Sequence, residues 1–193
     1  MPVQLLELIE TRLSDHKPGK KVWRRLMKRS AVAMILQVRQ GELHILMIKR
    51  AEREGDPWSG HMAFPGGRME TSDDSTRTTA ARETLEEVGV ELSAAEYLGH
   101  VDELVGNRRV SPRLVVAAHA FHLQSNQEFA LDPKEVQQAF WFPLADLHEP
   151  ARQVEHIVPE MPEVRFPGVV VGEPGRHIVW GLTFRFLDRM LQV

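Results

Sequence analysis

The sequence predicts an α/β protein in which a mixed sheet is sandwiched between helices. Continuous apolar runs bounded by turn residues recur between residues 31 and 171, and such runs are typical of strands. Three segments, 3–14, 73–88 and 178–191, instead repeat apolar residues at helical spacing. Strands with helices before, between and after them pack as layers around one core. The 193 residues, 42% of them hydrophobic, suffice for a single domain with a substantial core.

Composition excludes several classes of function. The formal net charge of −3 gives no overall attraction to nucleic acid. The chain has no cysteine, which excludes disulfides, a thiol nucleophile and a cysteine zinc site. No apolar run approaches the roughly 20 residues of a membrane span. Acidic residues near the start, Glu7, Glu10 and Asp15, argue against a signal or transit peptide. We therefore expect a cytoplasmic protein without nucleic-acid or membrane partners.

The first 30 residues are expected to form a helix and a basic connector that pack on a domain formed by residues 31–193. Leu5, Ile9 and Leu13 recur at helical spacing within residues 3–14. The connector from Lys17 to Arg29 is rich in lysine and arginine. It could attract phosphates, but a solvated linker with Trp23 and Leu26 packed inward is the interpretation we favour.

The middle of the chain begins with a predicted hairpin. Ala31–Val38 is a continuous apolar run, Gln40-Gly41 is a turn signal, and Leu43–Ile48 forms the returning strand. A polar loop, residues 50–61, leads to a short strand at residues 62–64 and then to Pro65-Gly66-Gly67. Glycines at this point allow the backbone to approach a ligand closely.

The later elements follow from the same patterns. Strands are expected at Tyr97–Leu104, Arg113–Leu123, Phe140–Phe142 and Phe166–Val171, a short helix after Pro143, and an amphipathic helix at Ile178–Leu191. His119 and His122 are three residues apart on a strand, so they point to opposite faces. They are therefore poor joint ligands for one metal ion.

The helix within residues 73–88 carries an unusual concentration of carboxylates. At about 100° per residue, Ala81, Thr84, Leu85 and Val88 share one face, and Glu83, Glu86 and Glu87 fall on the opposite face. N-cap candidates are Asp73, Asp74 and Ser75, and Gly89 is the expected C-cap.

These carboxylates need positive charge. Glu83 and Glu87 repel each other at i, i+4, and Arg82, which can reach Glu86, is a single charge against three. A hard divalent cation such as Mg²⁺ would supply the missing positive charge, and such ions are usually shared with substrate phosphates. The other interpretation is a solvated acidic helix face, and the preceding glycine pair favours the cation.

The segment from Gly67 to Val90 resembles the Nudix signature. That signature runs Gly, five residues, Glu, seven residues, Arg-Glu, an apolar position, any residue, Glu-Glu, any residue, Gly and an apolar position. Here Gly67 is followed by six residues, Asp74, seven residues and Arg82-Glu83-Thr84-Leu85-Glu86-Glu87-Val88-Gly89-Val90. The extra residue, the Asp in place of Glu, and Thr84 in place of an apolar residue are departures. The first two are similar to the coenzyme A pyrophosphatase branch of the family.

An upstream pattern also resembles that branch. It reads Leu46-Met47-Ile48-Lys49-Arg50, then Arg53, Gly60 and Phe64-Pro65-Gly66-Gly67. An apolar residue followed by Trp-Gly-x-Thr near the end of the chain is also common in the branch, and here it is Val179-Trp180-Gly181-Leu182-Thr183. The resemblance covers most of residues 31–190 and implies the α/β/α sandwich of the family.

The resemblance implies roles for individual residues in a pyrophosphohydrolase that uses Mg²⁺ or Mn²⁺. The metal ligands would be Glu83, Glu86 and Glu87, joined by the carbonyl of Gly66. Arg82 would orient the glutamates, and Asp74 would have a structural role at the helix start. The catalytic set would be completed by a general base, for which Glu135 is the first candidate and Glu128 the second. Substrate would be bound by Arg50, Arg53 and Gly67, with Arg108, Arg109 and Arg113 as further candidates.

The expected substrate is a small nucleotide, coenzyme A or an acyl derivative, cleaved to 3′,5′-ADP and a phosphopantetheine. ADP-ribose or NADH is an alternative substrate. A non-catalytic nucleotide-binding domain is a second alternative, although such domains typically lose the box glutamates. A third is an enzyme of RNA ends, with the basic stretch around Lys20 as its footprint. Nudix enzymes often dimerise, so a homodimer is compatible with the resemblance.

Overall fold

The computed structural model describes residues 2–19, 27–56, 58–106, 113–159 and 161–192. Its helices are α1 (Pro2–Asp15), α2 (Thr76–Val88) and α3 (Gly181–Gln192). The main sheet consists of β1 (Lys28–Arg39), β2 (Glu42–Arg50), β3 (Met62–Ala63), β4 (Gly66–Arg68), β5 (Glu96–Val105), β6 (Leu114–His122) and β7 (Val136–Pro143). A smaller sheet consists of β8 (Gln153–Val158), β9 (Met161–Val170) and β10 (Ile178–Trp180), and the short 3₁₀ helices η2 (Leu144–His148) and η3 (Pro150–Arg152) precede it.

Strand β1 is the centre of the main sheet. The order is β3-β2-β1-β6-β5, with β4 also paired to β1 and β7 to β2. The pairing of β1 with β6 is parallel and the other pairings are antiparallel, so the sheet is mixed as predicted. The apolar run in β1 is continuous because both faces of this strand are covered. Ala33 and Ile35 lie in the core on the α2 side, and Met34 and Leu36 lie in the core on the other side.

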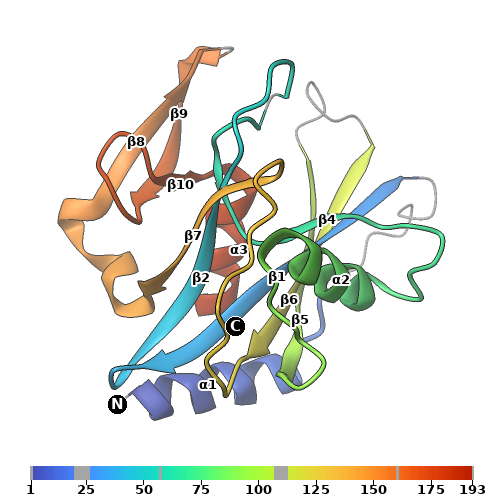
Figure 1. Ribbon diagram of the computed structural model, residues 1–193. Coiled ribbons are helices and arrows are strands. Elements are labelled where there is room, and N and C mark those ends of the chain that lie inside the picture. Colours follow the sequence, from blue (N-terminus) through green and yellow to red (C-terminus); the bar gives the residue numbers. More distant parts are fainter. Residues whose placement is uncertain (1, 20–26, 57, 107–112, 160, 193) are drawn as a thin grey trace.

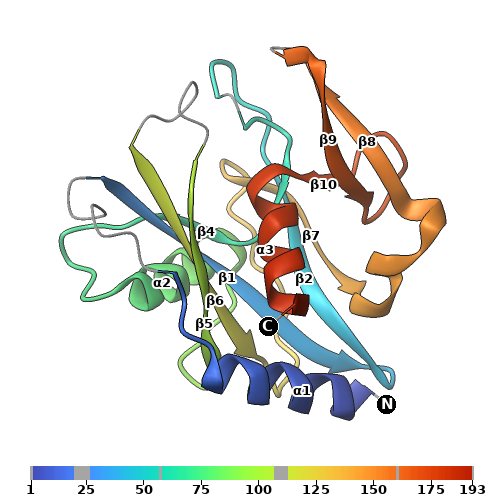
Figure 2. The same cartoon turned by 180° about the vertical axis from the view of Figure 1, so that it is seen from behind.

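The molecule has three layers, which confirms the predicted α/β/α sandwich. Helix α2 covers one face of the main sheet, and α1 and α3 cover the other (Figure 1). Figure 2 shows the second face, with α1 along the lower edge and α3 above it. Helix α1 buries Ile9 and Leu13 there as predicted, together with Leu6, whereas Leu5 is only partly buried. No helix in the described part of the chain is both long and apolar enough to cross a membrane.

The structure corrects three assignments. Residues 178–180, predicted as the start of a helix, form β10 and pair with Val170, Val169 and Gly168 of β9, and the helix begins only at Gly181. This run is β-branched and aromatic, which suits a strand. Strand β8 was not predicted, because its alternating charged and apolar residues lie in a segment rich in Pro and Gly. The glycine pair is itself part of a strand, β4, paired with Ser30–Val32.

The first strand begins earlier than expected, at Lys28, so the end of the basic connector belongs to the sheet. Residues 20–26 lie outside the described residues, and the predicted packing of Trp23 and Leu26 falls among them. Residues 107–112, which follow β5, lie outside them as well. The division of the chain at residue 30 stays a prediction.

Candidate active site

Helix α2 begins and ends at predicted caps. Ser75 is the N-cap, and its Oγ accepts a hydrogen bond from the Thr78 N–H at 3.1 Å. Gly89 has φ 72°, and its N–H donates to the Leu85 carbonyl at 3.0 Å. The left-handed conformation favours glycine at this position. The helix is therefore fixed at both ends on either side of its three glutamates.

The buried face of α2 differs from the face read from the sequence. Thr84 and Val88 are fully buried as expected, but Glu87 lies with them at 2% exposure. Leu85, expected on the apolar face, is 50% exposed. The face of α2 that packs on the sheet is thus rotated toward the glutamates relative to the predicted apolar face. As a result Glu87 is buried, Glu83 is mostly buried and Glu86 reaches solvent.

Glu87 is a buried carboxylate without an ion-pair partner among the described residues. Its Oε2 accepts a hydrogen bond from the Gly66 N–H at 2.8 Å. Burial raises the pKa of Glu87 to about 8, although the Gly66 hydrogen bond and the nearby Arg50 charge oppose this shift. Burial also raises the pKa of Glu83, against the opposing effect of Arg82. Both carboxylates would ionise more readily beside an added cation.

The two glycines of β4 allow the close approach of β1, β4 and α2. A Cβ on Gly66 would lie 2.2 Å from the Ala31 carbonyl oxygen, and Gly66 also has φ 152°. A Cβ on Gly67 would lie 2.3 Å from Oε2 of Glu83. The first contact is with backbone and the second with the end of a side chain. Gly66 therefore serves the packing of the sheet, and Gly67 leaves space for the Glu83 carboxylate.

Arg82 holds the acidic groups of the site together. Its guanidinium contacts Glu83 at 3.0 Å and Glu86 at 2.9 Å, and it donates to the Arg68 carbonyl at 2.9 Å. It also binds Asp73 through two hydrogen bonds of 3.0 and 3.1 Å. The Arg82 hydrogen bonds lower the pKa of Asp73 to about 2. The expected orienting role of Arg82 agrees with this geometry.

Asp73, rather than Asp74, is the buried acid before the helix. Asp74 is exposed, whereas the Asp73 side chain is only 3% exposed. Asp73 also accepts hydrogen bonds from the Glu70 N–H at 2.9 Å and the Thr79 hydroxyl at 3.0 Å. The signature places seven residues between this acid and Arg82, which points to Asp74, but the turn before Ser75 leaves Asp74 exposed and places Asp73 inside.

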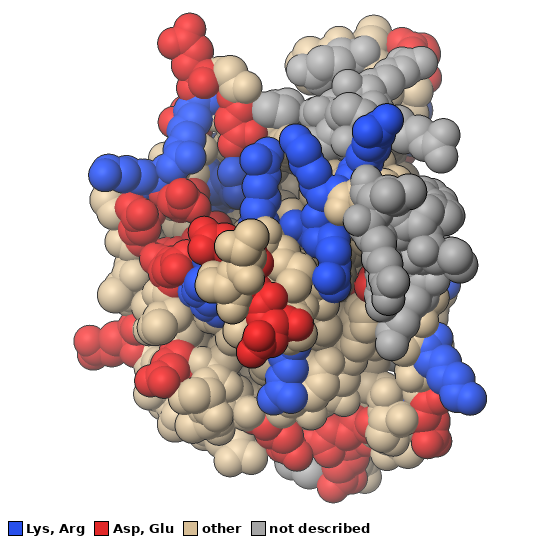
Figure 3. Space-filling model, turned by 90° about the vertical axis from the view of Figure 1, so that its right-hand side faces the viewer, with Lys and Arg blue, Asp and Glu red and all other residues tan. Residues whose placement is uncertain are grey.

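An open pocket of about 380 Å³ lies over the glutamates. It is lined by Glu70, Arg82, Glu83, Glu86, Asp132 and Glu135. The face of the molecule that carries α2 shows acidic side chains beside a group of lysine and arginine side chains (Figure 3). Of the two candidate general bases, the structure brings Glu135 to the pocket, whereas Glu128 is exposed and is not among the lining residues.

Backbone hydrogen bonds fix the segment that carries Glu135. The Asp132 N–H donates to the Glu87 carbonyl at 3.0 Å, and the Ala130 N–H donates to the Val88 carbonyl at 2.9 Å. The Glu135 carbonyl accepts from the Ala51 N–H at 2.8 Å. The Glu135 carboxylate lies 3.5 Å from the Arg53 guanidinium, and both side chains are close to half exposed. The segment is thus tied both to α2 and to the loop after β2.

The candidate substrate arginines have different surroundings. Arg50 pairs with Asp56 at 2.9 Å, and its Nε is buried without a hydrogen-bond partner among the described residues. Arg53 is more exposed and pairs with Glu135. Arg113 is exposed, and Arg108 and Arg109 lie outside the described residues. Arg50 is therefore the candidate that lies deepest, with one N–H available to an oxygen of a ligand.

The donor set fits a divalent cation. Three carboxylates lie on adjacent turns of one helix. The Arg82 guanidinium contacts Glu83 and Glu86, and burial raises the pKa of Glu83 and Glu87. Oxygen ligands of this kind suit Mg²⁺ or Mn²⁺. Glu83, Glu86 and Glu87 are the residues that would hold the ion. A contribution from the Gly66 carbonyl stays a prediction.

Sequence reasoning missed Asp56, Asp73 and Asp132 as parts of the site. Asp73 was considered only as a cap. A signal was present for Asp132, because Asp-Pro before a strand marks a turn that could be placed against α2. Asp56 had no such signal, because its role depends on the fold of the polar loop toward Arg50.

Comparisons with known proteins place most of this chain in one family. The family model described as the NUDIX domain matches residues 27–162. An uncharacterized protein of Schizosaccharomyces pombe is 43% identical over 114 residues, which are 57% of this chain and 35% of that protein. The peroxisomal coenzyme A diphosphatase NUDT7 of Mus musculus is 27% identical over 143 residues, 72% of this chain and 57% of that protein. The chain thus spans between about a third and three fifths of the length of these relatives.

Among solved structures, a MutT/nudix family protein from Enterococcus faecalis is similar in fold. It superposes with a TM-score of 0.56 at 18% identity, over 96% of this chain and 67% of that one. At this identity the likeness concerns the fold alone.

Proposed function

The chain belongs to the Nudix family, and we propose that it hydrolyses phosphoanhydride bonds with a divalent cation held by Glu83, Glu86 and Glu87. The observation that carries this proposal is the burial of Glu87, which has no ion-pair partner among the described residues, beside Glu83, which pairs with Arg82. A solvated acidic helix face would leave all three carboxylates in water at ordinary pKa. Here two of them, Glu83 and Glu87, are withdrawn from water, and the charge of Glu135 contributes to the raised pKa of both.

The bound ion would neutralise phosphate oxygens and lower the pKa of a bound water toward neutrality. The protein supplies the remaining tasks. Arg82 keeps Glu83 and Glu86 oriented, and the Gly66 N–H fixes one oxygen of Glu87, which leaves the other available. Arg50 offers its unsatisfied Nε–H to a phosphate oxygen, where a guanidinium binds strongly.

Glu135 is the proposed general base. It lines the pocket with the α2 glutamates, and its carboxylate is accessible to water. Arg53, which pairs with it, would bind substrate phosphate on the same side of the pocket. In the reaction, water adds across the P–O–P linkage, the bridging oxygen leaves with one phosphate, and the proton lost by water passes to Glu135.

Coenzyme A or an acyl derivative is the proposed substrate, cleaved to 3′,5′-ADP and the corresponding phosphopantetheine. Two observations support it: the Arg50, Arg53, Gly60 pattern before Phe64-Pro65-Gly66-Gly67, and the similarity to a mouse protein named a coenzyme A diphosphatase. The proposed setting is the cytoplasm.

A hydrolysis panel tests the proposal. Coenzyme A, acetyl-coenzyme A, ADP-ribose, NADH, diadenosine polyphosphate and dGTP are each incubated with Mg²⁺ or Mn²⁺, and products are separated by chromatography. Glu86→Gln serves as the inactive control, and Glu128→Gln serves as the matched control on an exposed glutamate. We expect release of 3′,5′-ADP from coenzyme A by the wild type and Glu128→Gln, and a loss of at least about 100-fold in Glu86→Gln.

The other outcomes discriminate between the alternatives. Turnover of ADP-ribose or NADH alone would keep the carboxylate mechanism and overturn the coenzyme A assignment. Binding of nucleotides without turnover of any of them would overturn the proposal in favour of a binding domain. Equal turnover in the wild type and Glu86→Gln would overturn the role of the α2 carboxylates.

A further inference from the structure

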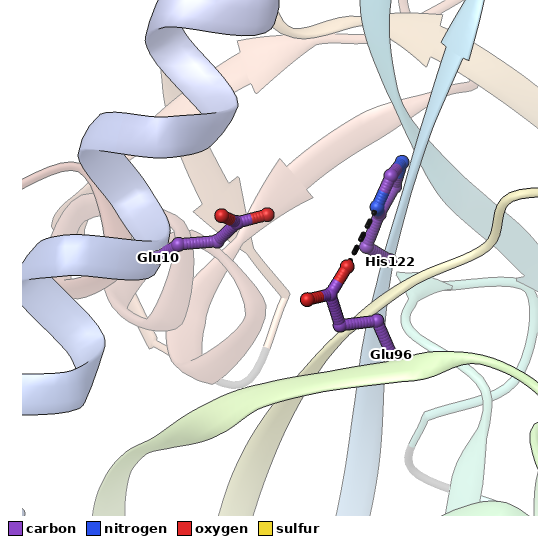
Figure 4. A group of neighbouring side chains, drawn as sticks. All are labelled: Glu10, Glu96 and His122. Carbon is purple, nitrogen blue, oxygen red and sulfur yellow. Dashed lines mark hydrogen bonds and ion pairs between the residues drawn. The ribbon is translucent and has the colours of Figure 1, made fainter.

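A second group of metal-ligating side chains lies away from the pocket. Glu10, Glu96 and His122 each present one ligand atom, and these atoms all lie within 4.8 Å of one another. Figure 4 shows the Glu10 carboxylate directed from α1 toward the His122 ring, with Glu96 beside that ring. The His122 Nδ1 lies 3.4 Å from a carboxylate oxygen of Glu96. The three side chains therefore converge on one point from three different elements.

The placement of these residues is set by the fold. Glu96 and His122 are direct partners across the antiparallel pairing of β5 and β6, so their side chains leave the sheet side by side. Glu10 follows Ile9, which is 2% exposed and anchors α1 on the same face. The sheet register and the helix docking are separate constraints, and both bring ligands to this place.

The group is on the opposite side of the sheet from the proposed active site. His119 contacts Thr76 of α2 at 2.9 Å, so it faces the α2 layer. His122 is three residues further along the strand and faces the α1 layer. This orientation, expected from the sequence, excludes the two histidines from one site but leaves His122 free to act with ligands from α1 and β5.

The charges of the group call for a cation. Two carboxylates meet one imidazole, and the Glu10 carboxylate has no hydrogen bond or ion pair to any residue in the described part of the chain. Glu96 has two contacts at 3.4 Å, with His122 and with the Gln124 amide. Burial and the Glu96 charge both raise the pKa of Glu10, which is the direction expected of a carboxylate without a counter-ion.

We propose that Glu10, Glu96 and His122 form a second divalent-metal site that takes Zn²⁺ and is independent of the α2 glutamates. An imidazole beside carboxylates favours Zn²⁺ over Mg²⁺, which prefers oxygen ligands alone. Bond lengths of about 2.0–2.2 Å require ligand atoms about 3.4 Å apart. The His122–Glu96 pair already has this separation, and an oxygen of Glu10 lies within 4.8 Å of both ligand atoms. Water would complete the coordination.

The proposed role of the ion is to fasten α1 to the sheet. It would join Glu10 of α1 to one residue from each of β5 and β6. Because an ion that binds only the folded chain adds to its stability, Zn²⁺ should raise the melting temperature, and the rise should grow with the logarithm of the free Zn²⁺ concentration above Kd. The chemistry at α2 should continue without it.

The test uses the full chain without an affinity tag, in saturating Mg²⁺ so that the α2 carboxylates are occupied. Bound Zn²⁺ is counted after equilibrium dialysis, and Co²⁺ replaces Zn²⁺ for visible absorption, which reports the coordination geometry of the bound ion. The variants are Glu10→Gln, Glu96→Gln and His122→Ala. Glu7→Gln, on the same helix and exposed, is the matched acidic control, and His148→Ala, also exposed, is the histidine control.

We expect one Zn²⁺ per chain and a Zn²⁺-dependent rise in melting temperature in the wild type and both controls. Each site variant should lose at least tenfold in Zn²⁺ affinity, and the Co²⁺ spectrum should be lost in His122→Ala. Melting without Zn²⁺ shows whether each variant is folded. The proposal would be overturned if the folded site variants bind Zn²⁺ as tightly as the wild type. It would also be overturned if the wild type binds no Zn²⁺ in the presence of saturating Mg²⁺. The Zn²⁺ proposal does not depend on coenzyme A hydrolysis. A failure of hydrolysis would therefore count against the proposed function and not against the Zn²⁺ site.

Discussion

At the scale of single residues, Glu87 is the group whose chemistry depends most on its surroundings. The burial that helps pack α2 on the sheet also leaves its carboxylate with one hydrogen bond and a pKa of about 8. Such a residue destabilises the metal-free protein when it ionises, and in the proposed metal site it would stabilise the metal-bound protein. Stability and function are therefore opposed at this position.

Glu87→Gln should change stability with opposite sign in the absence and presence of metal. The folded pKa lies above the usual 4.5, so the stability associated with the protonated form is lost as the pH rises through about 8. At pH 9 in a chelator, the substitution should raise the free energy of unfolding by on the order of 1–3 kcal/mol. In saturating Mg²⁺ the wild type should be the more stable protein. Urea unfolding measures both, and a loss of stability under both conditions would contradict this account.

Substitutions at Gly66 and Gly67 should have different effects, the first on the stability of the fold and the second on catalysis. Gly66→Ala places a Cβ 2.2 Å from the backbone of β1 and should destabilise the fold by about 2 kcal/mol or more. Gly67→Ala meets only the end of the Glu83 side chain, which can move. It should lower kcat/KM about 10- to 100-fold with a small change in melting temperature. Thermal melts and steady-state kinetics test the pair, and equal loss of stability in both variants would disagree with the geometry.

Asp73→Asn should weaken the protein in a pH-dependent way. Its pKa is lowered from 3.8 to about 2, so its contribution is present above pH 4 and is lost as the pH falls through 2. At pH 6 the substitution should cost about 2 kcal/mol, and at pH 3 about half of that. Urea titrations at the two pH values measure the difference. A cost that does not depend on pH would show that Arg82 does not favour the ionised form.

At the scale of elements, α2 and the segment at residues 130–136 act as one unit. The Gly89 backbone sits against Ala130, where a Cβ on Gly89 would lie 2.6 Å from that of Ala130. Two residues later, the Asp132 N–H caps the Glu87 carbonyl at 3.0 Å. The C-terminus of the helix thus positions the segment that brings Glu135 to the pocket.

Two helix-end substitutions should have different consequences for catalysis. Ser75→Ala removes the N-cap hydrogen bond and should cost about 1 kcal/mol without changing kcat. Gly89 has a left-handed φ of 72°, and a Cβ at this position would collide with Ala130. Gly89→Ala should therefore lower the free energy of unfolding by about 2 kcal/mol and displace Glu135. We expect kcat to fall at least tenfold in Gly89→Ala, measured well below the melting temperatures of both. Equal kcat values would show that the segment does not depend on the helix end.

The elements that the sequence predicted are those with a local cause. The caps Ser75 and Gly89, the buried run of β1 and the helical spacing of α1 are all local patterns, and the structure agrees with them. The exposure of Leu85 and the burial of Glu87 depend on how α2 rotates against the sheet, which local spacing does not determine. Likewise, Trp180 continues an apolar run, and its pairing with Gly168 of β9 is a long-range contact.

At the scale of the whole molecule, the sheet separates two chemically different faces. One face carries α2 and the other carries α1 and α3 (Figures 1 and 2). The carboxylates and the pocket belong to the first face, and the Glu10, Glu96 and His122 group lies between α1 and the sheet on the second. The family resemblance anticipated the layers and the α2 glutamates. It could not anticipate the second group, whose members are far apart in sequence and meet only through strand register and helix docking.

The central claim is that the α2 carboxylates hold the cation that drives cleavage of a phosphoanhydride. The most direct test is the Mg²⁺ dependence of coenzyme A hydrolysis in the wild type, in Glu83→Gln and in the exposed control Glu128→Gln. We predict that Glu83→Gln lowers kcat at least about 100-fold and shifts half-saturation to higher Mg²⁺, while Glu128→Gln matches the wild type. A Glu83→Gln variant with wild-type rate and Mg²⁺ dependence would contradict the account.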